Sequence, residues 1–130
     1  MRLFIFLFVL LAPALLRAGP AELQAGYAAQ VRSGGGAGTF DAARGQQFFN
    51  STHGGEWSCS SCHTRDPRQS GRHAVTGKTI APMAPAVNPE RFARADKVEK
   101  WFRRNCRDVV SRECTAQEKG DVMAYLMSLK

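Results

Sequence analysis

One pentapeptide constrains this chain more than any other feature, the run Cys59-Ser60-Ser61-Cys62-His63. Its two cysteines present two thiols on one short turn, and the histidine places an imidazole beside them. This is the spacing of the haem c attachment motif, in which the thiols bond to the two vinyl groups of a porphyrin and the histidine binds its iron. We therefore expect one covalent haem c, held by Cys59 and Cys62, with His63 as proximal ligand.

Two other kinds of site use paired cysteines, a zinc site and a redox dithiol. Structural zinc needs a second pair of ligands roughly two to four residues apart. The remaining cysteines, Cys106 and Cys114, are farther apart than that. A redox CxxC motif usually accompanies a βαβ pattern, and this sequence has no strand pattern. The sequence favours haem over both alternatives.

Residues 1–18 have the pattern of an export signal. A basic start precedes an apolar run over 3–16 that is short for a membrane span and is interrupted by Pro13. Ala18 ends an acceptable small-residue cleavage site. We expect cleavage there, which releases a single domain of residues 19–130 into the periplasm. An uncleaved membrane anchor is the alternative.

The charge of the chain bears on its partners. The 18 Lys and Arg against 11 Asp and Glu give a net charge of +7. Removal of residues 1–18 takes away Arg2 and Arg17 and leaves +5. A modestly basic exported domain suits an acidic protein partner or an anionic membrane surface. Nucleic acid is not an expected partner outside the cytoplasm.

Hydrophobic periodicity predicts an all-α domain of about four helices around the haem. The expected helices cover residues 21–32, a segment from the cap Asp41 to Phe49, a segment from Pro89 to about Val109, and a last helix behind the capping box Thr115-x-x-Glu118. Residues 33–38 are rich in glycine and predict a flexible link. Residues 54–86 lack periodicity, so we expect a long loop that the haem organises.

The iron ligand opposite His63 decides what such a protein does. A methionine gives a closed, six-coordinate electron carrier, a second histidine gives a low-potential carrier, and an open or weakly held position admits oxygen, nitric oxide or carbon monoxide. Met83 leads on the residues alone, although a methionine between two prolines also suits packing. The weaker candidates are Met123 and Met127, expected in the core or at its rim, His53, close to the motif, and His73, expected at the surface.

Asn105 is a different kind of candidate for the ligand opposite His63. It shares one stripe of the predicted 89–109 helix with Val98 and Trp101, and we expect that stripe to face the haem. An asparagine on a buried apolar face needs a partner for its amide, and ferric iron is such a partner.

The haem leaves Cys106 and Cys114 unassigned. An oxidising compartment favours a disulfide between them, which would tie the end of the third helix to the start of the fourth. A pair of free thiols is the alternative.

The predicted third helix also carries basic residues every three or four positions. They are Arg91, Arg94, Lys97, Lys100, Arg103, Arg104 and Arg107, interleaved with Glu90, Asp96, Glu99 and Asp108. One interpretation is a solvated helix face. The functional interpretation is a docking surface for an acidic electron-transfer partner.

Taken together, several segments resemble the sphaeroides haem protein family of oxygen-binding monohaem c-type cytochromes. They are Pro20-Ala21-Glu22-Leu23, Gly26-Tyr27, the 59–63 motif, Thr76-Gly77-Lys78, residues 80–85, Pro89-x-Arg91-Phe92, Val98-Glu99-Lys100-Trp101, Arg104-Asn105-Cys106, Cys114-Thr115 and Glu118-Lys119. The resemblance spans nearly the whole mature chain, and Arg-Asn-Cys with a later cysteine is its most specific part.

The resemblance implies a fold like that of class I cytochromes c, with Asn105 as the sixth ligand and Cys106 bonded to Cys114. The family has an apolar residue where Met83 stands, which favours packing for Met83. A neutral amide is a hard, weak ligand that matches ferric better than ferrous iron. Reduction should therefore release Asn105 and admit oxygen, nitric oxide or carbon monoxide.

The resemblance also implies partners. Electrons would come from a dihaem cytochrome c and a membrane b-type cytochrome. The family is proposed to act on oxygen or nitric oxide, as a dioxygenase that converts nitric oxide to nitrate. The alternative function is an ordinary six-coordinate His/Met electron carrier.

Overall fold

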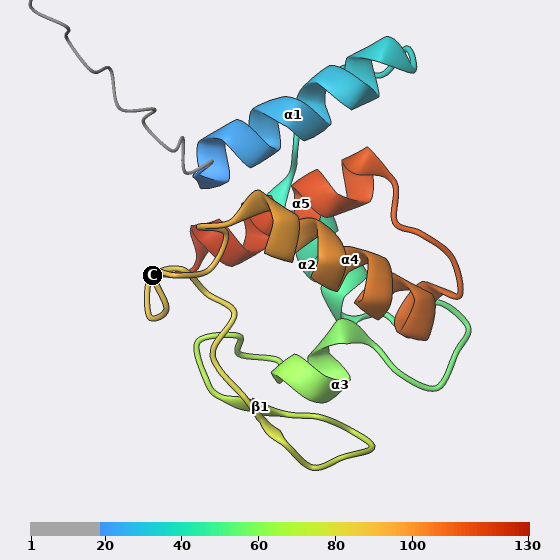
Figure 1. Ribbon diagram of the computed structural model, residues 1–130. Helices are drawn as coiled ribbons and strands as arrows, with labels where there is room; N and C mark the ends of the chain where they lie inside the picture. The colour runs from blue at the N-terminus through green and yellow to red at the C-terminus, as the bar shows by residue number, and fades with distance from the viewer. Residues whose placement is uncertain (1–18) are drawn as a thin grey trace, which may run out of the picture.

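The computed structural model describes residues 19–130 (Figure 1). Within them lie α1 (Pro20–Ser33), α2 (Ala42–Asn50), α3 (Cys59–His63), β1 (Gly71–Arg72), β2 (Thr79–Ile80), α4 (Ala95–Val110) and α5 (Ala116–Ser128). The predicted all-α class is confirmed. The predicted signal peptide, residues 1–18, lies outside the described residues. In the part of the chain from residue 19 onward, no helix has the length and apolar character to cross a membrane.

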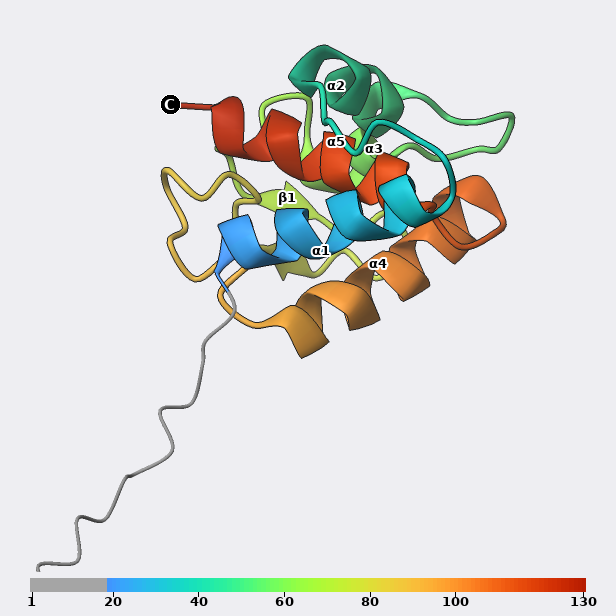
Figure 2. The same cartoon turned by 90° about the horizontal axis from the view of Figure 1, so that it is seen from above.

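Helix α5 is the centre of the fold. It packs along α2 on one side and α1 on the other (Figure 2). Its Met123 and Leu126 are fully buried, together with Phe49 of α2, and Tyr27 of α1 joins the same cluster. These apolar side chains recur at helical spacing, so the predicted faces of these helices are the ones that meet.

Helices α2 and α5 touch at a glycine. A β-carbon on residue 45 would overlap the carbonyl oxygen of Asp121 and come within 2.9 Å of the Tyr125 β-carbon. The Asp121 carbonyl belongs to the backbone of α5 and cannot rotate away as a side chain could. The close packing of α2 and α5 therefore requires Gly45.

We expect Gly45→Ala to lower the free energy of unfolding by about 3 kcal/mol, because overpacking a buried contact forces the backbones apart. Urea unfolding of the holoprotein, followed by far-UV circular dichroism, measures this. Gly26→Ala is the matched control, since nothing lies within 4 Å of a β-carbon built there. That change should be neutral or stabilising by up to about 1 kcal/mol. Equal effects of both variants would contradict the argument.

The predicted caps of α2 and α5 are confirmed. The Asp41 carboxylate accepts a hydrogen bond from the backbone N–H of Arg44 at 2.7 Å. Thr115 and Glu118 form the full capping box, because each side chain accepts from the backbone N–H of the other. Both caps satisfy N–H groups that the first turn of a helix leaves without partners.

The predicted start of the third helix at Pro89 is wrong, since α4 begins at Ala95. Phe92 has a φ of 61°, in the left-handed region that an α-helix cannot contain. Its side chain is buried in the core. Arg91 donates hydrogen bonds to the carbonyls of residues 81 and 82 at 2.7 and 2.8 Å. Tertiary contacts therefore hold these residues in turns and override their helical pattern.

The long segment after α2 is less irregular than predicted. It contains α3, a single turn that Ser58 caps, and a short antiparallel ladder that pairs Gly71 with Ile80 and Arg72 with Thr79. The prediction that strands are absent is therefore wrong for this ladder. Two residue pairs are too few to produce an alternating pattern in the sequence.

The glycine-rich residues 33–38 close α1 with a turn, in which the N–H of Gly36 donates to the carbonyl of Val31 at 2.9 Å.

Candidate functional site

A cavity of about 690 Å³ lies between α4 and the rest of the core. Helices α2, α3, α4 and α5 all contribute to its wall, as do residues 73–83 and 90–94. The lining is mostly apolar and includes Phe48, Phe49, Trp57, Ile80, Val98, Phe102, Val122 and Leu126. Cavities of this size and character bind cofactors and other large organic ligands.

The two cysteines and the histidine of the pentapeptide motif line this cavity. The single turn of α3 places Cys59, Cys62 and His63 together, because its capping box starts the turn at Ser58. Neither cysteine is part of a disulfide. Burial raises the pKa of the Cys59 thiol to about 11. The β1–β2 hairpin lies against the motif, where the N–H of Ala74 donates to the Cys62 sulfur at 3.3 Å.

His63 has the properties of a metal ligand. Burial lowers its pKa to about 4, and the positive charge of Arg91 acts in the same direction. The imidazole is therefore neutral at pH 7 and keeps a lone pair for a metal. Its Nδ1 atom is buried and has no hydrogen-bond partner within the described residues. Between residues 19 and 130, no three His, Cys, Asp or Glu side chains cluster to hold an ion, so a zinc site here would lack ligands.

Helix α4 supplies the opposite wall. Val98, Trp101 and Asn105 all line the cavity, as predicted from their shared stripe. Asn105 is half-buried, whereas Trp101 is 47% exposed, with the Arg104 guanidinium 5.7 Å from its ring. Trp101 thus reaches from the cavity to the surface.

The structure brings three of the candidate distal ligands to the cavity, Met83, Asn105 and His73. Met83 lines it as well as Asn105, and the backbone N–H of Met83 donates to Pro67 at 2.8 Å. His73 was expected at the surface but also lines the cavity, and its Nδ1 accepts from two backbone N–H groups of the hairpin. The others lie elsewhere: Met123 is buried in the core, Met127 packs against it, and His53 bonds to the Phe48 carbonyl.

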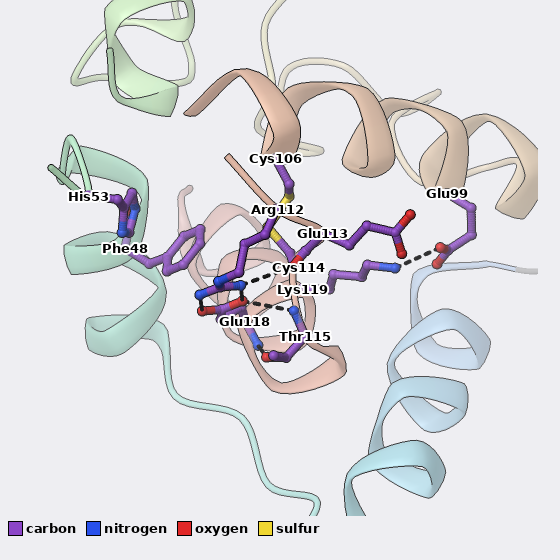
Figure 3. The surroundings of a disulfide bond; sticks show 10 residues. All are labelled: Phe48, His53, Glu99, Cys106, Arg112, Glu113, Cys114, Thr115, Glu118 and Lys119. Atoms are coloured by element: carbon purple, nitrogen blue, oxygen red, sulfur yellow. Dashed lines mark hydrogen bonds and ion pairs between the residues drawn. A yellow bond between two sulfur atoms is a disulfide. The ribbon is translucent and has the colours of Figure 1, made fainter. Parts of the chain in front are cut away.

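A disulfide joins Cys106, at the end of α4, to Cys114, just before α5 (Figure 3). The two Cα atoms are 5.7 Å apart, and both residues are buried. Beside it, Arg112 forms an ion pair with Glu118 at 2.7 Å. Cys106 directly follows Asn105, so the bridge holds the C-terminal end of the helix that carries the candidate ligand.

Several lining residues could not be foreseen from the sequence. Trp57 and Lys78 belong to the irregular segment, and Arg91 to the turns before α4. Arg91 keeps its place through its two hydrogen bonds to carbonyls of the 80–85 loop. These side chains reach the motif only through the folding of the irregular segments that carry them. No spacing in the sequence therefore indicates them.

The comparisons with known proteins agree with this geometry. Residues 35–126 match the family described as Domain of unknown function (DUF1924). The chain is 44% identical to the cytochrome c-type protein SHP of Cereibacter sphaeroides over 130 residues, with 96% of each sequence covered.

Two solved structures are similar along most of the chain. The structure of oxidised SHP, an oxygen-binding cytochrome c, aligns with a TM-score of 0.74 and 42% identity over 84% of this chain and 96% of that one. The solution structure of cytochrome c'' from Methylophilus methylotrophus, which gave insights into haem-ligand detachment, aligns with a TM-score of 0.71 and 35% identity. It covers 84% of this chain and 92% of that one.

A helical fold, a cofactor-sized cavity and these relatives define a monohaem c-type cytochrome with a covalently bound haem c. The predicted cofactor is therefore confirmed. At this identity and coverage the family is also shown: the chain belongs to the SHP family of cytochromes, as its sequence motifs predicted.

Proposed function

We propose that this protein is an exported, gas-binding cytochrome in which Asn105 is the sixth ligand of ferric iron and leaves when the iron is reduced. The observation that carries the proposal is the position of Asn105 in the α4 wall of the cavity that His63 also lines. SHP itself is an oxygen-binding cytochrome c, and haem-ligand detachment is described for cytochrome c''.

The residues of α3 have the roles that their chemistry allows. Cys59 and Cys62 hold the porphyrin through thioethers, and the neutral imidazole of His63 binds the iron. The bound haem supplies a one-electron couple and a coordination position for a diatomic gas. The surrounding apolar side chains, such as Phe49 and Val98, exclude water from it.

Asn105 and Met83 have different roles in this proposal. The Asn105 amide oxygen is a neutral, hard donor, which matches ferric iron better than ferrous iron. Met83 packs its side chain against the core and contributes to the wall of the cavity without binding iron. A permanent Met83 ligand would instead make the protein a closed electron carrier.

The proposed compartment is the periplasm. The pattern of residues 1–18 and the Cys106–Cys114 bridge both support it, because structural disulfides persist where the surroundings are oxidising.

The ferrous state tests the proposal. If Asn105 leaves on reduction, the optical spectrum of the ferrous protein should be high-spin, because one strong axial ligand is not enough for a low-spin state. Carbon monoxide and nitric oxide should then bind in stopped-flow mixing without a slow, gas-independent step. A low-spin ferrous spectrum with gas binding limited by ligand loss would establish the His/Met carrier instead.

The exposed face of α4 supplies the docking surface for an acidic electron donor. Within residues 19–130, Lys97, Lys100, Arg103 and Arg104 have no ion pair. Of the three acidic residues of α4, Asp96 and Glu99 are paired, at 2.6 and 2.8 Å, and Asp108 alone has no ion pair within the same residues. The uncompensated charge is therefore positive, and it surrounds the exposed Trp101. The donors that the family resemblance implies, a dihaem cytochrome c and a membrane b-type cytochrome, would bind here through acidic surfaces.

We expect the second-order rate of reduction by an acidic donor cytochrome to fall about tenfold when ionic strength rises from about 0.05 to 0.5 M. The double change Lys97→Glu with Arg104→Glu should lower the rate at low salt by a similar factor. Lys130→Glu, a charge change of the same kind outside α4, is the control. If the rate of reduction changes neither with salt nor with the two α4 substitutions, α4 is not the docking surface.

A further inference from the structure

Three side chains from three helices meet at one carboxylate. Tyr27 of α1 donates its hydroxyl hydrogen to Glu99 Oε1 of α4, and Lys119 Nζ of α5 donates to Glu99 Oε2 at 2.8 Å. Figure 3 shows the Glu99–Lys119 contact bridging α4 and α5. Each oxygen of Glu99 therefore has a donor from a different helix. We call Tyr27, Glu99 and Lys119 the polar node.

Aromatic rings flank the Tyr27 and Lys119 side of the polar node, whereas the Glu99 side chain is 37% exposed. The rings of Tyr27 and Phe102 meet edge to face, with centroids 6.4 Å apart. Lys119 Nζ lies 5.5 Å from the Tyr27 centroid and 5.9 Å from that of Phe102. Tyr27 is only 2% exposed. Hydrogen bonds to a charged group are stronger in such partly dry surroundings than in water.

Glu99 stays ionised in this setting. Burial acts to raise its pKa, but the hydrogen bonds from Lys119 and Tyr27 outweigh burial, so the pKa lies below its usual range. The carboxylate is therefore charged at pH 7 and accepts both hydrogen bonds.

The polar node matters because α4 has few other attachments. Helices α2 and α1 are each in extensive contact with α5, whereas α4 has no such extensive contact with another helix. Val98 and Phe102 pack against the core from α4, and Cys106 is bonded to Cys114. The node is the place where α4 bonds directly to both α1 and α5.

Asn105 lies between two of the attachments of α4, the polar node and the disulfide. It is six residues after Glu99, which is about 9 Å along a helix, and one residue before Cys106. A helix segment this short moves as a rigid rod. If the node is broken, α4 loses its direct bonds to α1 and α5, so the helix can shift away from the core and take Asn105 with it.

We propose that Glu99 is a positioning residue for Asn105, because the polar node fixes how far α4 stands from the haem and so how well the amide reaches the iron. The inference rests on the proposed function, since it requires Asn105 to be the ferric ligand. Glu99 touches neither haem nor gas in this proposal.

The ferric spectrum of the holoprotein tests it. Glu99→Ala should lower the ratio of Asn-bound to open ferric protein about tenfold, as expected for loss of a charged hydrogen-bonded group. Glu99→Gln keeps the side-chain shape and one acceptor oxygen, so it should recover much of the Asn-bound form. Asp96→Ala is the matched control, because Asp96 is paired with Arg94 just before the same helix and holds no other element. It should leave the spectrum unchanged.

A milder variant tests the same node in case Glu99→Ala fails to fold. Tyr27→Phe removes one hydrogen bond and keeps the ring, and it should shift the ferric ratio in the same direction, about threefold. Far-UV circular dichroism of each variant checks the fold.

The Asn105→Ala background separates the two proposals. There, Glu99→Ala should change the ferric spectrum no further, because the ligand is already gone. If Asn105→Ala opens the ferric iron while Glu99→Ala and Tyr27→Phe leave it fully Asn-bound, the positioning role is overturned and the proposed function stands. If Asn105→Ala itself leaves the ferric spectrum unchanged, both are overturned.

Discussion

Replacement of both Cys59 and Cys62 by alanine should leave no haem on the chain after denaturing electrophoresis, whereas the wild-type band should stain fully for haem. The reason is that thioethers survive denaturation, while iron coordination through His63 alone does not. A haem-staining gel with equal protein loading measures this.

The chain supplies a matched control for that experiment. The double change Cys106→Ala with Cys114→Ala also removes two cysteines, but these form the disulfide and should leave the haem stain intact. A single change at Cys59 or Cys62 should keep the stain through the other thioether. Stain on the Cys59→Ala, Cys62→Ala chain would overturn the attachment site.

Asn105→Ala should convert ferric protein from the Asn-bound form to a five-coordinate or water-bound form, nearly completely. The bond that is lost exists only in the ferric state, so carbon monoxide binding by the ferrous variant should match the wild-type rate within about twofold. Optical and electron paramagnetic resonance spectra report the ferric change, and stopped-flow mixing reports the ferrous rate.

Met83→Ala gives the opposing test. Met83 packs against the core, so its removal should lower the free energy of unfolding by about 2–3 kcal/mol and spare the ferric spectrum. The carrier alternative reverses both results: Met83→Ala would open the iron and Asn105→Ala would do little. Ferric spectra of the two variants at equal haem content separate these models.

The sequence predicted those parts of the fold that local chemistry determines. The caps at Asp41 and Thr115 were predicted because a cap depends on residues three positions apart. The start of α4 was not, because Arg91 and Phe92 are held by contacts with distant segments. Hydrophobic periodicity in the sequence cannot predict a backbone conformation that tertiary packing imposes.

The candidate site divides in the same way. The motif at 59–63 is contiguous, and Asn105 shares a helix stripe with Trp101, so both could be predicted from the chain alone. The polar node could not, since Tyr27 and Lys119 come from helices that meet only in the folded core. The family resemblance, rather than periodicity, favoured Asn105 over Met83.

The four cysteine sulfurs of this domain form two different kinds of bond, thioethers to the haem and a disulfide. All four cysteines line the same cavity, but Cys106 and Cys114 are only 5% and 7% exposed, whereas Cys59 and Cys62 are partly exposed. Thiol–disulfide exchange requires direct access of a thiolate to the sulfur it attacks. A reductant that maintains the 59–62 thiols for porphyrin attachment can therefore act in an oxidising compartment without opening the buried bridge. Access to the sulfur, rather than thiolate character, therefore distinguishes the two pairs, because burial also raises the pKa of the Cys59 thiol to about 11.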